Sequence, residues 1–279
     1  MAGLDVLSGT DFMKPILTLA AGLMAASAMH AAEPFLVAHR GASHDAPENT
    51  LPAYELAWKQ GADAIEGDFH LTSDGKIVCI HDYDTKRVSG TKLVVKDSTL
   101  AELQALDAGA WFKPEFKGTK LPTLREVAAT VPAGKKFYVE VKCGPEIVPT
   151  MLEDLAASKL KDDQIVVISF QAPVIAEVKK VKPAYKACWL ASFEKESPLK
   201  PSKDEVLGTL LKIKANGFSS KADERLDQDF IKAVQDAGFE YHCWTVDDVA
   251  TARRFLDLGI LSVTTNRPEF LRKGLSAAH

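Results

Sequence analysis

Residues 136–170, KFYVEVKCGPEIVPTMLEDLAASKLKDDQIVVISF, contain two apolar runs that flank a segment with helical spacing. The runs at 136–142 and 164–170 are short and apolar enough to form strands that are covered on both faces. Between them, 146–159 has apolar residues three and four positions apart, as in a helix packed on one side. The order strand, helix, strand is typical of a parallel sheet with helical crossovers.

The same alternation runs from Phe35 to the last strand. It predicts nine strands, at 35–39, 63–71, 76–81, 136–142, 164–170, 185–191, 216–220, 240–246 and 260–265. The predicted helices are at 51–61, 124–131, 146–159, 173–181, 227–238 and 246–259. A closed eightfold barrel needs one strand fewer, and the turn sequence TSDG (72–75) accounts for the surplus by joining two strands without a helix. We therefore expect an α/β fold, a (β/α)8 TIM-type barrel, with an open doubly wound sheet as the alternative.

Segment 82–123 interrupts this alternation. It is rich in Asp, Lys, Gly and Thr, with a short helix near 100–106 and an aromatic turn, WFKPEF. We expect a small insertion at one end of the barrel, within a single catalytic domain at 33–279. The chain is 46% hydrophobic and 26% charged, as in soluble globular proteins, and its net charge of −4 argues against nucleic acid as a partner.

The first 32 residues have the pattern of a secretory signal peptide. Lys14 precedes an apolar stretch, and small residues follow at 26–28, which suit a cleavage site. A cut near Ala31 and a buried N-terminal helix are the alternatives, and the residues before Met13 are interpreted as an upstream extension. We expect export, to the periplasm or outside the cell, with no stable membrane insertion after cleavage.

Four cysteines in an exported chain raise the question of disulfides. Cys79, Cys143, Cys188 and Cys243 permit three pairings or free thiols, and the sequence does not choose among them. There is no C-x-x-C motif, so a thiolate zinc site is not expected. Because all four lie in apolar, strand-like runs, we expect them to be small buried residues.

Carboxylates lie on two of the predicted strands. Glu66 and Asp68 are two positions apart, which places both on one side of a strand, and Glu140 ends the strand at 136–142. In a barrel these side chains meet at the carboxyl end, where three carboxylates need a cation. Ligation by oxygen alone suits one Ca²⁺ or Mg²⁺ ion better than zinc. Solvated edges and an ion pair with Lys142 are the simpler alternatives for these residues.

Histidines and fixed positive charges follow other strands. His39 and Arg40 end the first strand, His81 ends the third, and Lys142 follows Glu140 by two positions. Imidazoles exchange protons near neutral pH, and the cations suit an anionic substrate. Together with a metal ion they describe a site for a phosphate ester.

Seven short motifs, in order along the chain, resemble those of the glycerophosphodiester phosphodiesterase family of the exported, bacterial type. They are H-R-G at 39–41, P-E-N-T at 47–50, E-G-D at 66–68, T-S-D-G at 72–75, H-D at 81–82, E-V-K at 140–142 and W-T-V at 244–246. The resemblance implies a phosphodiesterase-like barrel that hydrolyses a small-molecule glycerophosphodiester to sn-glycerol 3-phosphate and an alcohol. It also implies that the reaction passes through a cyclic phosphodiester.

The resemblance implies a role for each matching residue. It implies His39 and His81 as the acid/base pair, Glu66, Asp68 and Glu140 as metal ligands, Arg40 and Lys142 on the phosphate, and Glu48 and Asn49 lining or bracing the substrate site. For the single divalent cation, expected export favours Ca²⁺ over Mg²⁺.

Four aromatic residues are candidates for the side of the site that holds the leaving alcohol. They are Trp111, Phe112, Phe170 and Trp244, with core packing as the alternative for each. Of these, we expect Phe170 and Trp244, which end strands, to contact substrate. An open, mostly apolar surface there would accept several alcohols.

One position departs from the family pattern. Where relatives commonly have T-D-x-P after the last strand, this chain has TTNRP at 264–268, with Asn266 in place of the acid. We interpret the residue as a brace on neighbouring groups, so that the change tunes the site and does not abolish it.

Two rival functions remain at this stage. A phospholipase C/D-like phosphodiesterase would use the same type of barrel, and a non-catalytic periplasmic protein would bind glycerophosphodiesters without cleaving them. Neither a contiguous apolar lip for a membrane nor the loss of a histidine or acidic residue is found in the sequence.

Overall fold

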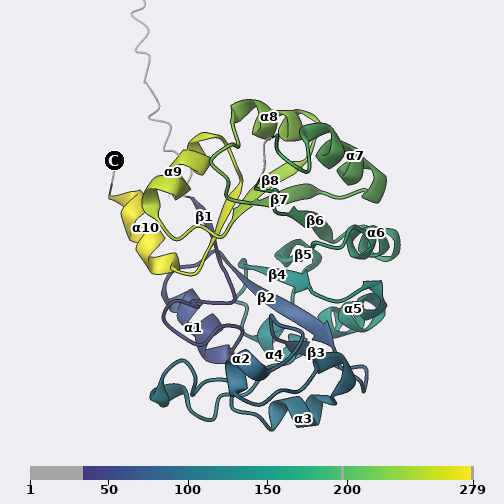
Figure 1. Ribbon diagram of the computed structural model, residues 1–279, viewed down its shortest axis with the longest axis vertical. Coiled ribbons are helices and arrows are strands. Elements are labelled where there is room, and N and C mark those ends of the chain that lie inside the picture. The colour runs from purple at the N-terminus through teal and green to yellow at the C-terminus, as the bar shows by residue number, and fades with distance from the viewer. Residues whose placement is uncertain (1–33, 196–197, 278–279) are drawn as a thin grey trace, which may run out of the picture. The chain divides into compact units, whose positions relative to one another are not determined.

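Eight parallel strands close into a barrel in the computed structural model, which describes residues 34–195 and 198–277 (Figure 1). The barrel strands are β1 (Phe35–Ala38), β2 (Ala64–Leu71), β4 (Lys136–Val141), β5 (Ile165–Ser169), β6 (Lys186–Ala191), β7 (Gly217–Lys221), β8 (Glu240–Trp244) and β9 (Ser262–Thr265). β1 pairs with both β2 and β9, which closes the ring and confirms the TIM-type barrel over the open sheet. The predicted signal segment lies outside the described residues.

The surplus strand is an antiparallel extension of β2. β3 (Ile77–Cys79) pairs with Phe69–Leu71 after the turn at 72–75, as the sequence predicts. β4 pairs along one edge of β2, so β1 and β3 must share the other edge. β1 pairs there with Ala64 and Ile65, and β3 pairs with the residues that follow at Phe69–Leu71. β3 therefore runs back toward the end of β1, and His81 reaches the barrel from this return and not from a parallel strand.

Helices surround the barrel (Figure 1). They are α1 (Leu51–Lys59), α4 (Leu124–Ala129), α5 (Val148–Ala156), α6 (Ala172–Val181), α7 (Lys203–Ile213), α8 (Gln228–Asp236), α9 (Val249–Asp257) and α10 (Pro268–Ser276). α7 and α10 are not among the helices expected from the sequence, although Ser202 and Glu205 form a capping box at the start of α7. None of the helices in the described part of the chain is long and apolar enough to span a bilayer.

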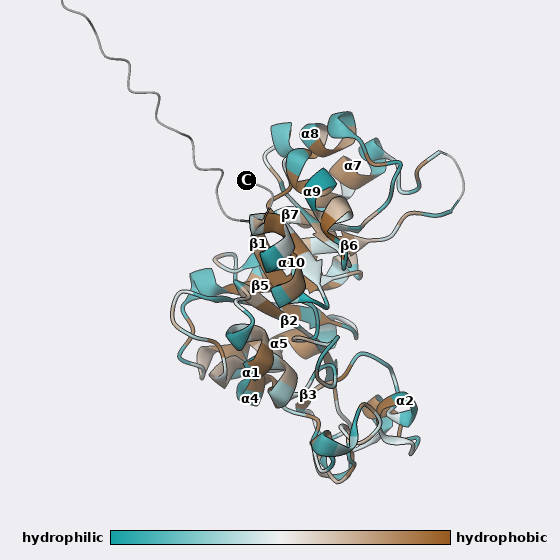
Figure 2. Ribbon diagram, turned by 90° about the vertical axis from the view of Figure 1, so that its left-hand side faces the viewer, coloured by the Kyte–Doolittle hydropathy of each residue, from teal (hydrophilic) through white to brown (hydrophobic). Residues whose placement is uncertain are grey.

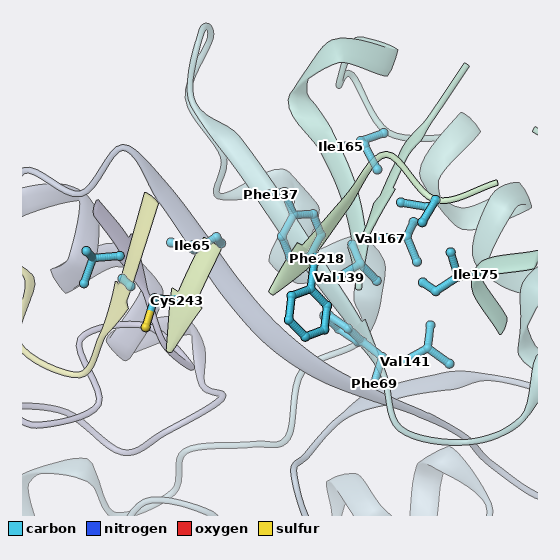
Figure 3. Close-up of a cluster of buried hydrophobic side chains, with 14 of the residues drawn as sticks. Ile65, Phe69, Phe137, Val139, Val141, Ile165, Val167, Ile175, Phe218 and Cys243 are labelled. Carbon is cyan, nitrogen blue, oxygen red and sulfur yellow. The ribbon is translucent and has the colours of Figure 1, made fainter. Parts of the chain in front are cut away.

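The core has two layers because side chains alternate along each strand. On β4, Phe137, Val139 and Val141 point outward and pack with Ile175 of α6 and other buried side chains (Figure 3). The intervening Tyr138 packs in a separate buried cluster with residues of the neighbouring strands. The strands are mainly apolar, whereas the outer helices carry both polar and apolar residues (Figure 2).

The insertion has a hydrophobic cluster of its own. Between β3 and α4 the chain forms α2 (Lys86–Ser89), α3 (Leu100–Gln104) and the 3₁₀ turns Val95–Asp97 and Pro114–Phe116. Two further 3₁₀ turns lie outside the insertion, one before and one after α5, at Pro145–Ile147 and Asp162–Gln164. The insertion's cluster comprises Val78, Ile80, Val88, Val95, Leu103, Ala108 and Leu121. Since Val78 belongs to β3, this cluster ties the insertion to the hairpin that delivers His81.

The four cysteines all lie within the described residues and are free. Cys79, Cys188 and Cys243 are buried, and Cys143 is partly buried. The expectation of small buried residues therefore holds for three of the four, and none of the three possible pairings is formed in this structure.

Candidate active site

A cavity of about 230 Å³ opens at the carboxyl ends of the barrel strands. Its lining residues are His39, Arg40, Glu66, His81, Tyr138, Glu140, Lys142, Ile168, Phe170, Leu190, Ser219, Trp244 and Thr264. This one cavity therefore brings together both predicted histidines, both cations, two of the three carboxylates and the two aromatic residues at strand ends. Asp68 is fully buried and is not among the lining residues.

The three predicted metal ligands form one buried cluster. The pairing of β2 with β4 sets Asp68 opposite Glu140, and Glu66 lies two residues earlier on β2. Their carboxylates each offer an oxygen, and these oxygens lie within 4.8 Å of one another. The alternative of a solvated edge is excluded for Glu66 and Asp68, which are 1% and 0% exposed.

The charges in this cluster do not balance. Burial and the neighbouring carboxylates raise the pKa of Glu66 well above its usual range, and burial and Asp68 raise that of Glu140 to about 7. Although burial opposes it, the charges of Arg40 and Lys142 lower the pKa of Asp68 to about 2. Arg40 Nε lies 3.2 Å from Asp68 Oδ2, and Lys142 Nζ lies 2.7 Å from Glu140 Oε1. Two cations therefore leave three buried carboxylates short of positive charge.

The cluster fits a divalent cation. Glu66 Oε1 and Asp68 Oδ1 are buried without a hydrogen-bond partner, which is costly unless another group binds them. A hard cation with oxygen ligands would bind both atoms and let all three carboxylates ionise. Glu66, Asp68 and Glu140 are thus the residues that could hold it.

A strained turn places Arg40 over the cluster. Arg40 and Gly41 have φ angles of 56° and 81°, in the left-handed region that favours glycine. At Gly41 a Cβ atom would come within 2.6 Å of the backbone carbon of Ala53, so no larger residue fits. The turn aims the backbone N–H of Arg40 at Glu66, which accepts it through Oε2 at 2.9 Å.

Asn49 supports the cluster from behind and does not line the cavity. Its amide nitrogen donates to Asp68 Oδ2 at 2.8 Å, and its amide oxygen accepts from the Tyr54 hydroxyl at 2.9 Å. Asn49 is 1% exposed. Its position agrees with a bracing role and leaves no direct path to substrate.

His81 is oriented through a chain of ionic contacts that reaches into the insertion. Its Nδ1 lies 2.8 Å from Asp82 Oδ1, and Asp82 Oδ2 accepts from Arg87 Nε at 2.7 Å. Arg87 also donates to both oxygens of Glu48, at 2.9 and 2.8 Å, and Glu48 Oε1 accepts from Arg40 at 3.1 Å. Glu48 therefore braces two guanidinium groups and does not line the cavity.

His39 is held by neutral groups instead. Its Nδ1 lies 2.7 Å from Asn266 Oδ1, and the Asn266 amide nitrogen donates to Asp247 Oδ2 at 2.6 Å. Burial and the adjacent Arg40 lower the pKa of His39 to about 4. The interpretation of Asn266 as a brace thus acquires a specific partner, His39.

Two of the four candidate aromatics line the cavity. The rings of Phe170 and Trp244 meet edge to face with centroids 5.4 Å apart, and Lys142 Nζ lies 5.7 Å from the Phe170 centroid. Phe170 is 42% exposed, so simple core packing does not describe it. Trp111 and Phe112 do not line this cavity, and Trp111 lies instead beside Arg87.

Sequence reasoning missed several residues of the site. Tyr138 lines the cavity because it alternates with the outward Phe137 and Val139, a pattern that the sequence already contained. Arg87 gave no signal, because its charge is one of several in the insertion. Asp247 follows the W-T-V motif directly, but only the fold brings it to Asn266.

A second group with metal-ligand chemistry lies in the barrel. Cys188, Glu240 and His242 bring ligand atoms within 4.8 Å of one another. Glu240 forms an ion pair with Lys186, His242 Nε2 lies 3.5 Å from Glu240 Oε2, and His242 Nδ1 lies 2.8 Å from Ser262 Oγ. The one carboxylate here, Glu240, thus has a cation and an imidazole beside it, whereas His242 Nε2 is buried without a hydrogen-bond partner.

Known proteins share both sequence and fold with this chain. A glycerophosphodiester phosphodiesterase of Bacillus subtilis is 34% identical over 255 residues, which cover 85% of each chain. A phosphodiesterase of Oleispira antarctica, solved in complex with the product sn-glycerol-3-phosphate, has a TM-score of 0.79 at 25% identity and covers 87% of this chain and 97% of its own. A glycerophosphodiester phosphodiesterase structure from Agrobacterium tumefaciens gives 0.71 at 26%, over 86% of this chain and 99% of its own.

The family model agrees with these relatives. The glycerophosphoryl diester phosphodiesterase model matches residues 39–270, from the first histidine of the cavity into the last helix. This match covers more than half of the chain, and it confirms the expectation of a phosphodiesterase. The chain therefore belongs to the glycerophosphoryl diester phosphodiesterase family.

Proposed function

We propose that this chain hydrolyses glycerophosphodiesters to sn-glycerol 3-phosphate and an alcohol, with one divalent cation and two histidines. The observation that carries the proposal is the convergence of His39, His81 and the carboxylate cluster on one cavity. The family and the relative with bound sn-glycerol-3-phosphate support the substrate class.

The chain's own residues supply most of the chemistry. Arg40 and Lys142 face the cavity as fixed positive charges and bind the phosphate oxygens. A glycerol hydroxyl next to the phosphorus attacks it, one imidazole takes the hydroxyl proton, and the other gives a proton to the departing alcohol. In the second step water opens the cyclic phosphodiester, and the two imidazoles exchange roles. Each step conserves protons, so the pair is ready for another cycle.

Glu66, Asp68 and Glu140 are proposed to hold the cation. Bound there, it would offset the negative charge of the phosphoryl oxygens and of the ligands themselves. The ligands are all oxygens, which suits either Ca²⁺ or Mg²⁺, and Ca²⁺ is favoured of the two because export is expected. Dialysis against EDTA should abolish turnover, and titration with each ion should restore it with the higher apparent affinity for Ca²⁺.

The two histidines provide the direct test. His39→Ala and His81→Ala should each lower kcat on glycerophosphocholine by about 10²–10⁴, measured as released glycerol 3-phosphate. Turnover near that of the wild type in either variant contradicts its assignment. Binding of substrate without product would favour the non-catalytic alternative, and faster cleavage of intact phospholipid than of its deacylated product would favour the phospholipase alternative.

Export to the periplasm or beyond the cell remains part of the proposal. Its support is the pattern in the first 32 residues alone. Expression of the full chain in a bacterial host, followed by cell fractionation and N-terminal sequencing, should find a protein that begins after residue 28 or near Ala31. An uncleaved protein in the cytoplasm contradicts export.

A further inference from the structure

Asn266 is locked in one orientation between a carboxylate and an imidazole. Asp247 accepts three hydrogen bonds: from Asn266 Nδ2 at 2.6 Å, from the Asn266 backbone N–H at 2.7 Å and from Thr265 Oγ1 at 2.9 Å. A carboxylate that receives three donors leaves only the NH₂ group of the amide to face it. The amide oxygen of Asn266 must therefore point the other way, to His39 Nδ1 at 2.7 Å.

This lock decides which nitrogen of His39 carries the proton. An amide oxygen only accepts hydrogen bonds, so the nitrogen facing it, Nδ1, must be the donor. In the neutral imidazole, Nε2 then has a free lone pair, and His39 lines the cavity. Ser43 adds to the lock, since its hydroxyl lies 2.8 Å from the same amide oxygen.

The other histidine has a different partner. His81 Nδ1 faces the carboxylate of Asp82, whereas His39 Nδ1 faces a neutral amide. The charged groups that act on His39 are Arg40, which opposes a second positive charge, and Asp68 and Glu48, which favour it. Burial is the main cause, and together with Arg40 it lowers the pKa of His39 to about 4. The two imidazoles therefore differ in the group that faces Nδ1, a carboxylate at His81 and a neutral amide at His39.

We propose that Asn266 is a positioning residue: it fixes His39 with its proton on Nδ1, so that His39 accepts the proton of the attacking hydroxyl on Nε2 and His81 protonates the leaving alcohol. In the first step the hydroxyl oxygen bonds to phosphorus as its proton passes to His39. The phosphorus–oxygen bond to the alcohol breaks, and that oxygen takes the proton of His81. This assignment of roles rests on the proposed function.

An exchange of two side chains tests the role of Asn266. In the double variant Asp247→Asn, Asn266→Asp, the new amide at 247 keeps the same three contacts, while the carboxylate moves next to His39. A carboxylate in contact with an imidazole favours its charged form by about one to three pH units. The acid limb of the kcat/KM–pH profile, measured with saturating Ca²⁺, should move to higher pH by about one unit or more. A profile that coincides with that of the wild type overturns the proposal.

Two further variants separate positioning from stability. Asn266→Ala should lower kcat by roughly tenfold to a hundredfold, as for other residues that orient a reacting histidine. Ser262→Ala is the matched control: Ser262 begins β9, the strand that Asn266 follows, and contacts the buried His242 Nδ1 at 2.8 Å. It should lower the Tm without moving kcat or the pH profile. An Asn266→Ala enzyme with the kcat of the wild type overturns the proposal.

A measurement that does not need activity separates this inference from the proposed function. In ¹⁵N-labelled protein, with signals assigned from a His39→Gln variant, the ring proton of His39 should be on Nδ1 at neutral pH. Finding it on Nε2 overturns the role of Asn266 even in an active enzyme. If the wild type releases no glycerol 3-phosphate, the proposed function fails, and the assigned roles fail with it.

Discussion

Two polar clusters lie in this barrel, and they differ in how their charges are balanced. Around Asp68 three carboxylates share two cations, and two buried oxygens have no hydrogen-bond partner. Around Glu240 one carboxylate has both Lys186 and His242 beside it, which lower its pKa to about 2. Hence the first cluster, the acidic cluster, has more carboxylates than cations, whereas the second, the paired cluster, has a cation for its one carboxylate. An excess of buried carboxylates over cations, more than the residue types themselves, marks a site built to bind a cation.

The largest effect is expected when one ligand of the acidic cluster is removed. Glu66→Gln keeps the shape of the side chain but should lower kcat by about 10³, because it weakens cation binding and the electrostatics of the site. The Tm of the metal-free protein should stay the same or rise, since the uncharged form of Glu66 is already favoured there. Assays of turnover and calorimetry with and without Ca²⁺ test both parts. Full turnover in this variant would contradict the claim that the acidic cluster, unlike the paired cluster, holds a cation needed for turnover.

Removing the brace on His81 should have a smaller effect. Arg87→Ala deletes the contacts to Asp82 and Glu48 and should lower kcat by roughly tenfold to a hundredfold, the range typical of residues that orient reacting groups. The control is Lys92→Ala, which removes a cation of the same insertion that is 65% exposed and lies 3.7 Å from Asp84. Equal kcat values in the two variants would exclude a role for the insertion in orienting His81.

The clusters should respond to pH in opposite directions in metal-free protein. Because the pKa of Glu140 is raised to about 7, its contribution to stability is present at low pH and is lost as pH rises through about 7. Because the pKa of Glu240 is lowered to about 2, its contribution is present near neutral pH and is lost as pH falls from about 4.5 toward 2. The Tm measured between about pH 3 and pH 8 should therefore fall at both ends. Glu140→Gln should remove the loss at neutral pH, and Glu240→Gln the loss in acid.

The smallest effect is expected in the paired cluster. Lys186→Met removes a partly exposed ion pair with Glu240, which should cost about 1 kcal/mol of unfolding free energy or less. kcat and KM should not change, because Lys186 does not line the cavity. Urea unfolding and steady-state assays measure the two quantities. A changed kcat would show that the paired cluster influences the chemistry, and it would contradict the claim that only the acidic cluster does.

Much of the fold follows from local sequence. All nine strands were predicted close to their observed positions, because short buried runs separated by helical spacing leave few alternatives. The turn sequence at 72–75 identified the extra strand, because it joins two strands without room for a helix between them. α7 and α10 were missed, although Ser202 and Glu205 form a capping box and Pro268 begins α10, both signals at helix starts.

The sequence by itself determined which residues gather at the carboxyl end of the barrel. A parallel barrel aims all strand ends at one place, so His39, Glu66 and Glu140 were expected to meet. Only the tertiary structure decided how each is held. That Arg87 of the insertion reaches His81 through Asp82, and that Asp247 turns the amide of Asn266 toward His39, depends on contacts between segments far apart in the chain. Such contacts leave no local pattern, because the direction of a hydrogen bond depends on the fold around it.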